Sequence, residues 1–162
     1  MLKLLASLFL IITLGTAQGA YAGPYEDADA AYRRGDLETA VRMWRPLAAQ
    51  GHAKAQISLG FMYEHGLVVV QDYKEAVRLY RLAADQGDVD AQYMLGEMYD
   101  LGQGVVQNYV RAHMSFMLSV ANGATYASQN RDKVAKKLNS SQIKQAQEMA
   151  QRCKASSYKQ CD

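Results

Sequence analysis

One pair of residues in this sequence has the spacing of a serine hydrolase. Ser141 and Lys144 fit S-x-x-K, in which a lysine assists a serine nucleophile. The sequence contains neither S-D-N nor K-T-G, the motifs that complete such a site. Ser156 and Lys159 have the same spacing, so the pattern arises easily by chance. We therefore interpret Ser140 and Ser141 as caps of a C-terminal helix, and keep a hydrolase using Ser141 and Lys144 as the alternative.

Other chemical motifs are missing from the sequence. The histidines, His52, His65 and His113, have no i, i+4 pairing with one another, whereas a metal site needs convergent ligands. There is no glycine-rich phosphate loop, no G-x-S-x-G and no H-E-x-x-H. We expect a protein that is not an enzyme and that binds no metal and no cofactor.

The two cysteines, Cys153 and Cys161, are predicted to form a disulfide. An even number of cysteines in an exported protein favours a structural pair. This bridge would close a short loop and hold the chain after the last helix against that helix.

The N-terminal residues have the pattern of a secretory signal peptide. Lys3 precedes an apolar run over residues 4–14, and Ala20-Tyr21-Ala22 is a small-x-small cleavage site. The run is shorter than the roughly 20 residues of a membrane helix, although an uncleaved anchor is the alternative. We expect cleavage after Ala22, no stable membrane span afterwards, and a periplasmic or secreted protein.

Charge is distributed unevenly along the rest of the chain. Residues 24–130 carry nine Lys and Arg against thirteen Asp and Glu, and residues 131–162 carry eight against three. A nucleic-acid-binding domain would usually be more basic, so we expect no nucleic-acid partner. The basic end is interpreted as a solvated capping face, with docking to an anionic polymer or membrane as the alternative.

The sequence repeats itself at an offset of 36 residues. Residues 48–60 read AAQGHAKAQISLG, and residues 84–96 read ADQGDVDAQYMLG. Trp44, Tyr80 and Phe116 continue the same offset. A fixed period of this size predicts a solenoid, in which each unit buries its apolar face against its neighbours.

Within each repeat the apolar spacing is helical, as in Ala55, Leu59 and Tyr63 at i, i+4 and i+8. Asp72 and Asn108 are predicted helix N-caps. The expected helices cover residues 25–34, 37–50, 53–65, 72–86, 89–101, 108–122, 124–138 and 140–154, and no strand is expected. The predicted fold is all-α, a right-handed solenoid of stacked helical hairpins with a C-terminal capping helix pair. Its expected divisions are a signal peptide (1–22), a shortened hairpin (23–52), two repeats (53–88 and 89–123) and a cap with a tail (124–162).

Two of these units resemble the Sel1-like repeat family, a relative of the tetratricopeptide repeats. The pattern is A-x-x-x-L-G-x-x-Y-x-x-G-x-G-V, followed by D-x-x-x-A-x-x-x-Y-x-x-A-A-x-x-G. It is carried by Ala91, Leu95, Gly96, Tyr99, Gly102, Gly104, Val105 and Asn108, and by Asp72, Ala76, Tyr80, Ala83, Ala84 and Gly87. The resemblance implies a scaffold for protein complexes, often at the bacterial envelope. Some family members are linked to β-lactam compounds, which gives the hydrolase alternative its substrate class.

The sequence departs from the family pattern at three places. Val68 stands where the pattern has its second glycine, and a positive φ would strain valine, so we expect a loop of different shape there. The first hairpin passes from Gly35 directly to Asp36 and lacks about five loop residues compared with the family pattern. After Gly123 the pattern fades, which predicts a cap.

The resemblance also implies a binding surface, because the first helix of each tetratricopeptide-like hairpin lines the concave wall. The residues expected to face this wall are Lys54, Ile57, Phe61, Glu64, His65, Asp90, Tyr93, Glu97 and Asp100. We expect further contributions from Glu26, Ala30, Arg33, Gln129 and Lys133. Ile57, Phe61 and Tyr93 would form an apolar centre with an acidic rim, suited to an envelope-associated protein or peptide segment with an apolar anchor and basic residues. The alternative is that Ile57 and Phe61 pack against neighbouring helices.

Overall fold

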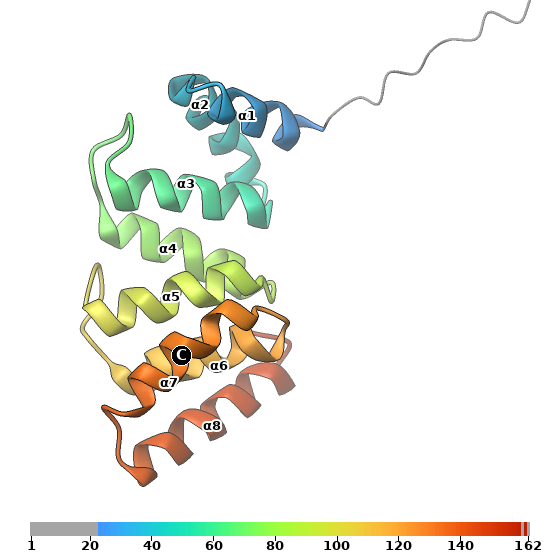
Figure 1. The fold of residues 1–162 in the computed structure, drawn as a ribbon. Coiled ribbons are helices and arrows are strands. Elements are labelled where there is room, and N and C mark those ends of the chain that lie inside the picture. Colours follow the sequence, from blue (N-terminus) through green and yellow to red (C-terminus); the bar gives the residue numbers. More distant parts are fainter. Residues whose placement is uncertain (1–22, 160, 162) are drawn as a thin grey trace, which may run out of the picture.

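The computed structural model describes residues 23–159 and Cys161, and in this part of the chain it is all-helical (Figure 1). The helices are α1 (Pro24–Arg33), α2 (Leu37–Ala49), α3 (Ala53–His65), α4 (Tyr73–Ala84), α5 (Val89–Leu101), α6 (Tyr109–Ala121), the 3-10 helix η1 (Thr125–Ala127), α7 (Ser128–Ala135) and α8 (Ser140–Ala155). The predicted signal peptide, residues 1–22, lies outside the described residues. Over the residues described, no helix combines the length and the apolar character needed to cross a membrane.

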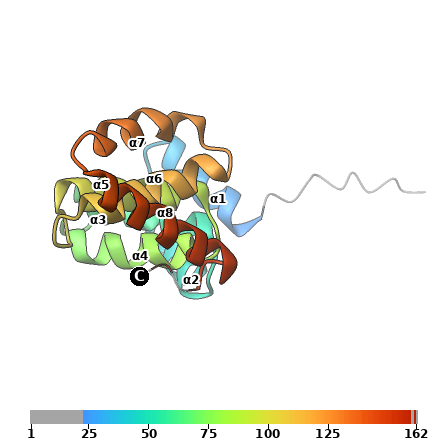
Figure 2. The same cartoon turned by 90° about the horizontal axis from the view of Figure 1, so that it is seen from below.

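The helices form three successive hairpins, α1–α2, α3–α4 and α5–α6, which stack along one axis (Figure 1). Each helix packs against the next one in the chain up to α7, and α8 packs against α6. In the view turned by 90°, α7 lies to one side of α6, and α8 lies next to α6 (Figure 2). The all-α solenoid of stacked hairpins predicted from the repeat is confirmed.

Side-chain caps define where several helices begin. The Asp72 carboxylate accepts hydrogen bonds from the backbone nitrogens of Lys74 and Glu75, at 2.9 and 3.0 Å. The prediction that Ser140 and Ser141 cap the last helix is wrong, because the capping residue is Asn139, whose side chain accepts from Gln142 N at 3.0 Å. The Gln142 side chain accepts in return from Asn139 N at 2.9 Å, which completes a capping box.

The two repeat loops have the same shape, so the different loop predicted at Val68 is wrong. Val68 has φ 52° and Gly104, at the equivalent position, has φ 69°. Both loops are closed by the same backbone hydrogen bond, 2.9 Å long, from Asp72 N to the Tyr63 carbonyl and from Asn108 N to the Tyr99 carbonyl. Val68 adopts the left-handed conformation because these bonds fix the backbone, and its side chain is 46% exposed.

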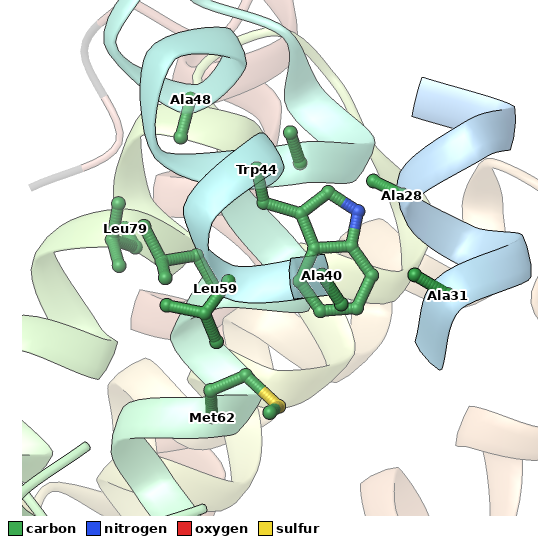
Figure 3. Close-up of a cluster of buried hydrophobic side chains, with 10 residues drawn as sticks. Ala28, Ala31, Ala40, Trp44, Ala48, Leu59, Met62 and Leu79 are labelled. Carbon is green, nitrogen blue, oxygen red and sulfur yellow. The ribbon is translucent and has the colours of Figure 1, made fainter. Parts of the chain in front are cut away.

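Large aromatic side chains fill the interior of each hairpin. Tyr80 and Phe116 are fully buried, and the glycine opposite each ring allows the two helices to approach. A Cβ atom on Gly60 would lie 2.7 Å from the Tyr80 ring, and one on Gly96 would lie 2.5 Å from the Phe116 ring. In the first hairpin, Trp44 of α2 extends toward the small residues Ala28 and Ala31 of α1 (Figure 3).

Candidate partner-binding surface

A hollow of about 200 Å³ opens among the first three hairpins and is mainly apolar. Its lining residues are Asp29, Tyr32, Trp44, Ile57, Ser58, Phe61 and Met94. From α1 it takes Asp29 and Tyr32, and the expected Glu26, Ala30 and Arg33 do not line it. The reason is the rotation of α1, which directs Ala28 and Ala31 into the core and leaves Asp29 and Tyr32 at its edge.

Ile57 and Phe61 line this hollow and also pack against the core, so the two sequence interpretations of these residues describe the same arrangement. Both side chains are partly buried and contact neighbouring core clusters. The Phe61 ring stacks on His65 of the same helix, with the ring centroids 4.1 Å apart. Lys54 is exposed at the beginning of α3, and its Nζ lies 6.0 Å from the centre of the Tyr25 ring.

Glu64 is fixed by a tyrosine from the interior. The hydroxyl of Tyr80 passes between the helices and donates a 2.6 Å hydrogen bond to Glu64 Oε2. Burial, followed by the bond to Glu64 and by its negative charge, raises the pKa of Tyr80 far above its ordinary range. The tyrosine therefore stays protonated and holds this carboxylate at the end of α3.

Asp100 occupies the equivalent position in the next repeat but has a different partner. The residue 36 positions after Tyr80 is Phe116, which has no hydroxyl to donate. Asp100 instead pairs with Lys137 Nζ at 2.5 Å, and this lysine lies over the Tyr109 ring at 4.4 Å. Because Phe116 replaces the tyrosine of the preceding repeat, the Asp100 carboxylate is bound by Lys137, which follows α7.

The remaining α5 residues of the predicted surface also contact the C-terminal part. Tyr93 donates to Glu97 Oε1 at 2.8 Å and accepts from Asn130 Nδ2 at 2.9 Å. Tyr126 packs edge-on against Tyr93 and donates a hydrogen bond to Asp90. Burial raises the pKa of Glu97, the hydrogen bond from Tyr93 opposes this rise, and the charges of Glu64 and Asp100 add to it.

The nine predicted residues therefore form two groups. The open group, on α3, is Lys54, Ile57, Phe61, Glu64 and His65. The covered group, on α5, is Asp90, Tyr93, Glu97 and Asp100, which contact one another or residues of η1, α7 and the segment after it, although Asp90 itself remains exposed.

Sequence reasoning missed five of the residues that line the hollow: Asp29, Tyr32, Trp44, Ser58 and Met94. The spacing of Tyr25, Ala28 and Tyr32 at i, i+3 and i+7 is the helical signal that could have located the inward face of α1. The contacts of residues 124–138 with α5 had no comparable sequence signal, because these residues do not follow the repeat.

The described residues offer no catalytic or metal-binding cluster of the kinds considered. Within the described ranges, no three His, Cys, Asp or Glu residues are placed to hold a metal ion. Ser141 is exposed in the first turn of α8, and the contact of Lys144 is with Glu148 Oε1, at 3.9 Å. These positions do not support the hydrolase alternative.

Comparison with known proteins gives a repeat family and similar solved structures. The family model described as Sel1 repeat matches residues 53–88 and 89–114. A protective antigen present in uropathogenic Escherichia coli strains, displaying an SLR fold, is 30% identical with a TM-score of 0.76 over 85% of this chain. A Sel1 repeat protein from Oxalobacter formigenes is 31% identical with a TM-score of 0.62, over 68% of this chain and 86% of that protein. The chain spans 32% of the length of the E. coli antigen. The comparison with curated proteins gave no match.

Proposed function

The chain belongs to the Sel1 repeat family, and we propose that it is an exported adaptor that binds a segment of a protein partner against the inner wall of its solenoid. Sel1 repeats typically mediate protein–protein interactions, and their fold is generally a non-catalytic scaffold. The finer parts of the proposal are export, the position of the bound segment and the chemistry of that segment.

The observation that carries the proposal is the apolar hollow lined by α1, α2, α3 and α5. Tyr32, Ile57 and Phe61 offer aromatic and aliphatic surface that stacking of the hairpins leaves partly exposed. Asp29 lines the hollow and pairs with Arg33 at 2.5 Å, and Glu64 lies one turn after Phe61 on α3. An apolar anchor within a polar rim is the usual arrangement of a binding hot spot. The proposed partner segment places an apolar side chain in the hollow and a lysine or arginine beside these carboxylates.

The open group and the residues of the hollow form the proposed site, and the covered group borders it. Asp90, Tyr93 and Asp100 already have partners in Tyr126, Asn130 and Lys137, described above. A segment that needed those three residues would first have to displace η1 and α7. The shorter site along α1 and α3, extending to Met94 of α5, requires no such displacement.

The binding test compares two apolar residues that differ in their position. Peptides enriched by display on the mature chain are measured for affinity with Phe61→Ala and with Val70→Ala, a valine that is 88% exposed on the α3–α4 loop. Removing a hot-spot side chain costs about 2 kcal/mol or more, so Phe61→Ala should weaken binding at least about tenfold. Val70→Ala should bind as the wild type does.

A second variant separates binding from folding. Ser58→Arg places a bulky cation in the hollow without removing an apolar side chain, and it should also weaken binding. Circular dichroism melting serves as the control for both variants. Unchanged affinity in folded Phe61→Ala and Ser58→Arg would contradict the proposed site.

Export is supported by the signal-peptide pattern before Gly23 and by the disulfide between Cys153 and Cys161. Disulfides persist in oxidising compartments such as the periplasm. The expected result is an intact mass that begins at Gly23 and lacks the two hydrogens of free thiols, measured without reductant on protein expressed in a bacterium with its native leader. A mass that includes residues 1–22, or two free thiols, would contradict export with cleavage.

A further inference from the structure

The exposed aliphatic side chains gather at the two repeat loops. Among the residues that the structure describes, six large hydrophobic residues are exposed, and four of them lie on these loops or next to them: Val68, Val70, Leu101 and Val106. Val70 and Val106 are each 88% exposed and lie 36 residues apart, so successive repeats present the same side chain. Exposed apolar residues that cluster mark a site that binds a protein or a membrane.

The two loops and the α7–α8 turn follow one another along one edge of the solenoid, at the left in Figure 1. We call residues 66–74, 100–109 and 136–139 the loop edge. Each loop is closed by the backbone bond described above, and Gly104 packs against the Tyr73 backbone. Val68 keeps its side chain in spite of a φ of 52°, a conformation that favours glycine. The aliphatic side chains therefore protrude from a fixed support.

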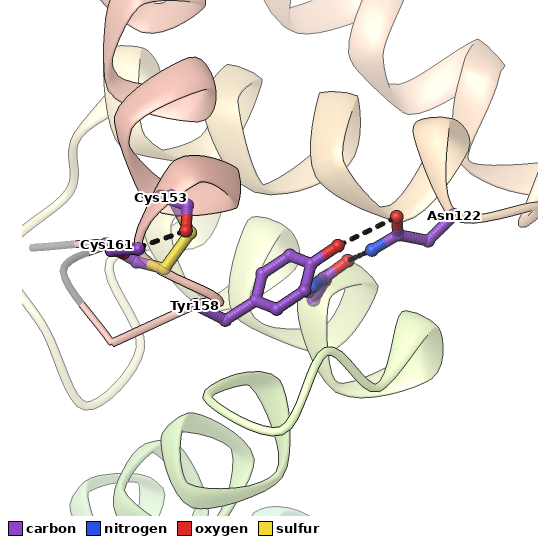
Figure 4. Close-up of a disulfide and its surroundings, with 6 residues drawn as sticks. Asn122, Cys153, Tyr158 and Cys161 are labelled. Atoms are coloured by element: carbon purple, nitrogen blue, oxygen red, sulfur yellow. Dashed lines mark hydrogen bonds between the residues drawn. A yellow bond between two sulfur atoms is a disulfide. The ribbon is translucent and has the colours of Figure 1, made fainter.

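The opposite edge is covered by the chain that follows α8. The disulfide draws Cys161 back to α8, and the Tyr158 ring lies against Gly87 at the turn after α4 (Figure 4). The Tyr158 hydroxyl donates to Asn122 Oδ1, at the end of α6, at 3.0 Å (Figure 4). No described residue covers the loop valines in this way.

Exposed lysines accompany the valines of the loop edge. Lys74 lies in the first turn of α4, and Lys136 directly follows α7. Both are exposed, and neither forms an ion pair with a described residue. The two carboxylates of this edge are engaged, because Asp72 caps α4 and Asp100 pairs with Lys137. The loop edge therefore presents positive charge together with aliphatic surface.

The composition of the loop edge differs from that of the hollow proposed to bind a protein segment. The hollow presents Tyr32, Trp44 and Phe61, and aromatic residues are enriched in protein–protein interfaces. Valine is under-represented among binding hot spots, and lysine is depleted from such interfaces. Aliphatic side chains with lysines beside them fit the boundary between the acyl chains and the phosphates of an anionic bilayer.

We propose that the loop edge binds the surface of a membrane that contains anionic lipids. Val70 and Val106 enter the boundary between headgroups and acyl chains, and Lys74 and Lys136 bind lipid phosphates. The loops need no reordering, so little conformational entropy is lost on binding. The hollow is lined by helices and not by these loops, so one molecule can hold a membrane and a protein segment together.

The test measures the partition of the mature chain onto vesicles by sedimentation. Vesicles of phosphatidylglycerol and phosphatidylcholine in equal parts should bind it, more weakly as salt is added, and vesicles of phosphatidylcholine alone should bind it poorly. Lys74→Gln and Lys136→Gln should each lower the partition constant about fivefold, the factor that corresponds to about 1 kcal/mol. Val70→Ala with Val106→Ala should lower it about tenfold, because fewer methyl groups enter the bilayer.

Matched controls come from the opposite edge. Leu82, near the end of α4, is 40% exposed, and Lys154 is exposed in the last turn of α8. Leu82→Ala and Lys154→Gln should bind the anionic vesicles as the wild type does, and circular dichroism melting checks that every variant is folded. No binding to anionic vesicles, equal binding to both kinds of vesicle, or equal weakening by the control variants would overturn the proposal.

Sedimentation velocity without lipid tests whether a second copy of the chain occupies the loop edge instead. A dimer that becomes a monomer when both valines are replaced by alanine would assign the loop edge to self-association and overturn membrane binding. The peptide affinity of Val70→Ala, measured above, is expected to stay unchanged. Failure of membrane binding is therefore distinguishable from failure of the proposed function.

Discussion

The conformation of single residues shows where the repeat tolerates a change and where it does not. Val68 and Gly104 occupy equivalent loop positions and have similar positive φ values. A Cβ on Gly104 would lie 2.3 Å from the Tyr73 carbonyl oxygen, whereas the Val68 side chain is 46% exposed. The same backbone conformation is therefore compatible with a side chain in one loop and not in the other.

This difference predicts opposite changes in stability for the substitutions Val68→Gly and Gly104→Val. The left-handed conformation costs an L-residue roughly 1–2 kcal/mol, and the greater freedom of unfolded glycine offsets part of it, so Val68→Gly should raise the free energy of unfolding by up to about 1 kcal/mol. Gly104→Val should lower it, because the new side chain meets the Tyr73 backbone. Urea denaturation of both variants is the measurement. A Val68→Gly protein less stable than the wild type would show that its backbone is not strained.

At the scale of the element, the helices with repeat signals could be predicted from the sequence to within two residues at each end. Asp72 and Asn108 cap α4 and α6 as predicted, because their short polar side chains accept bonds from the first turn. The expected helix over residues 124–138 is instead η1 and a shorter α7. This segment has no side-chain cap at its start, so its sequence contained no boundary signal.

The attachment of α7 should depend on pH through His113. This α6 residue is buried, and its Nδ1 lies 3.2 Å from the Arg131 carbonyl oxygen of α7. Burial lowers the pKa of His113 from 6.5, and the hydrogen bond to the Arg131 carbonyl opposes this shift in part. The charge of Arg131 lowers the pKa further, and that of Asp132 raises it. The unfolded chain therefore binds a proton first, and the contribution of neutral His113 to stability, complete above about pH 6.5, is lost as the pH falls below it.

Melting temperatures between pH 7.5 and 5.5 should thus fall more steeply for the wild type than for His113→Gln. Glutamine can donate a hydrogen bond to the same carbonyl but does not titrate. Glu97 also has a raised pKa, but it is present in both proteins and so does not contribute to the difference between their slopes. Equal slopes in the two proteins would exclude His113 as the source of the pH dependence.

At the scale of the whole molecule, the sequence predicted the solenoid but only part of its candidate surface. The repeat period determines which helices stack, and this follows from spacing alone. The rotation of α1 and the contacts of Tyr126, Asn130 and Lys137 with α5 depend on the first hairpin and the cap, which depart from the repeat. Those contacts join residues 36 to 37 positions apart without any repeated pattern, and no local signal predicts them.

The second helix of each hairpin begins at Leu37, Tyr73 and Tyr109, at an interval that never changes. A chain built in this way can be lengthened by whole hairpins. A copy of residues 53–88 inserted after position 88 would give the new helices the neighbours that the existing ones already have. Duplication of one such unit would therefore lengthen the solenoid by two helices that pack as the existing ones do, and the surface proposed for partner binding would lengthen with it.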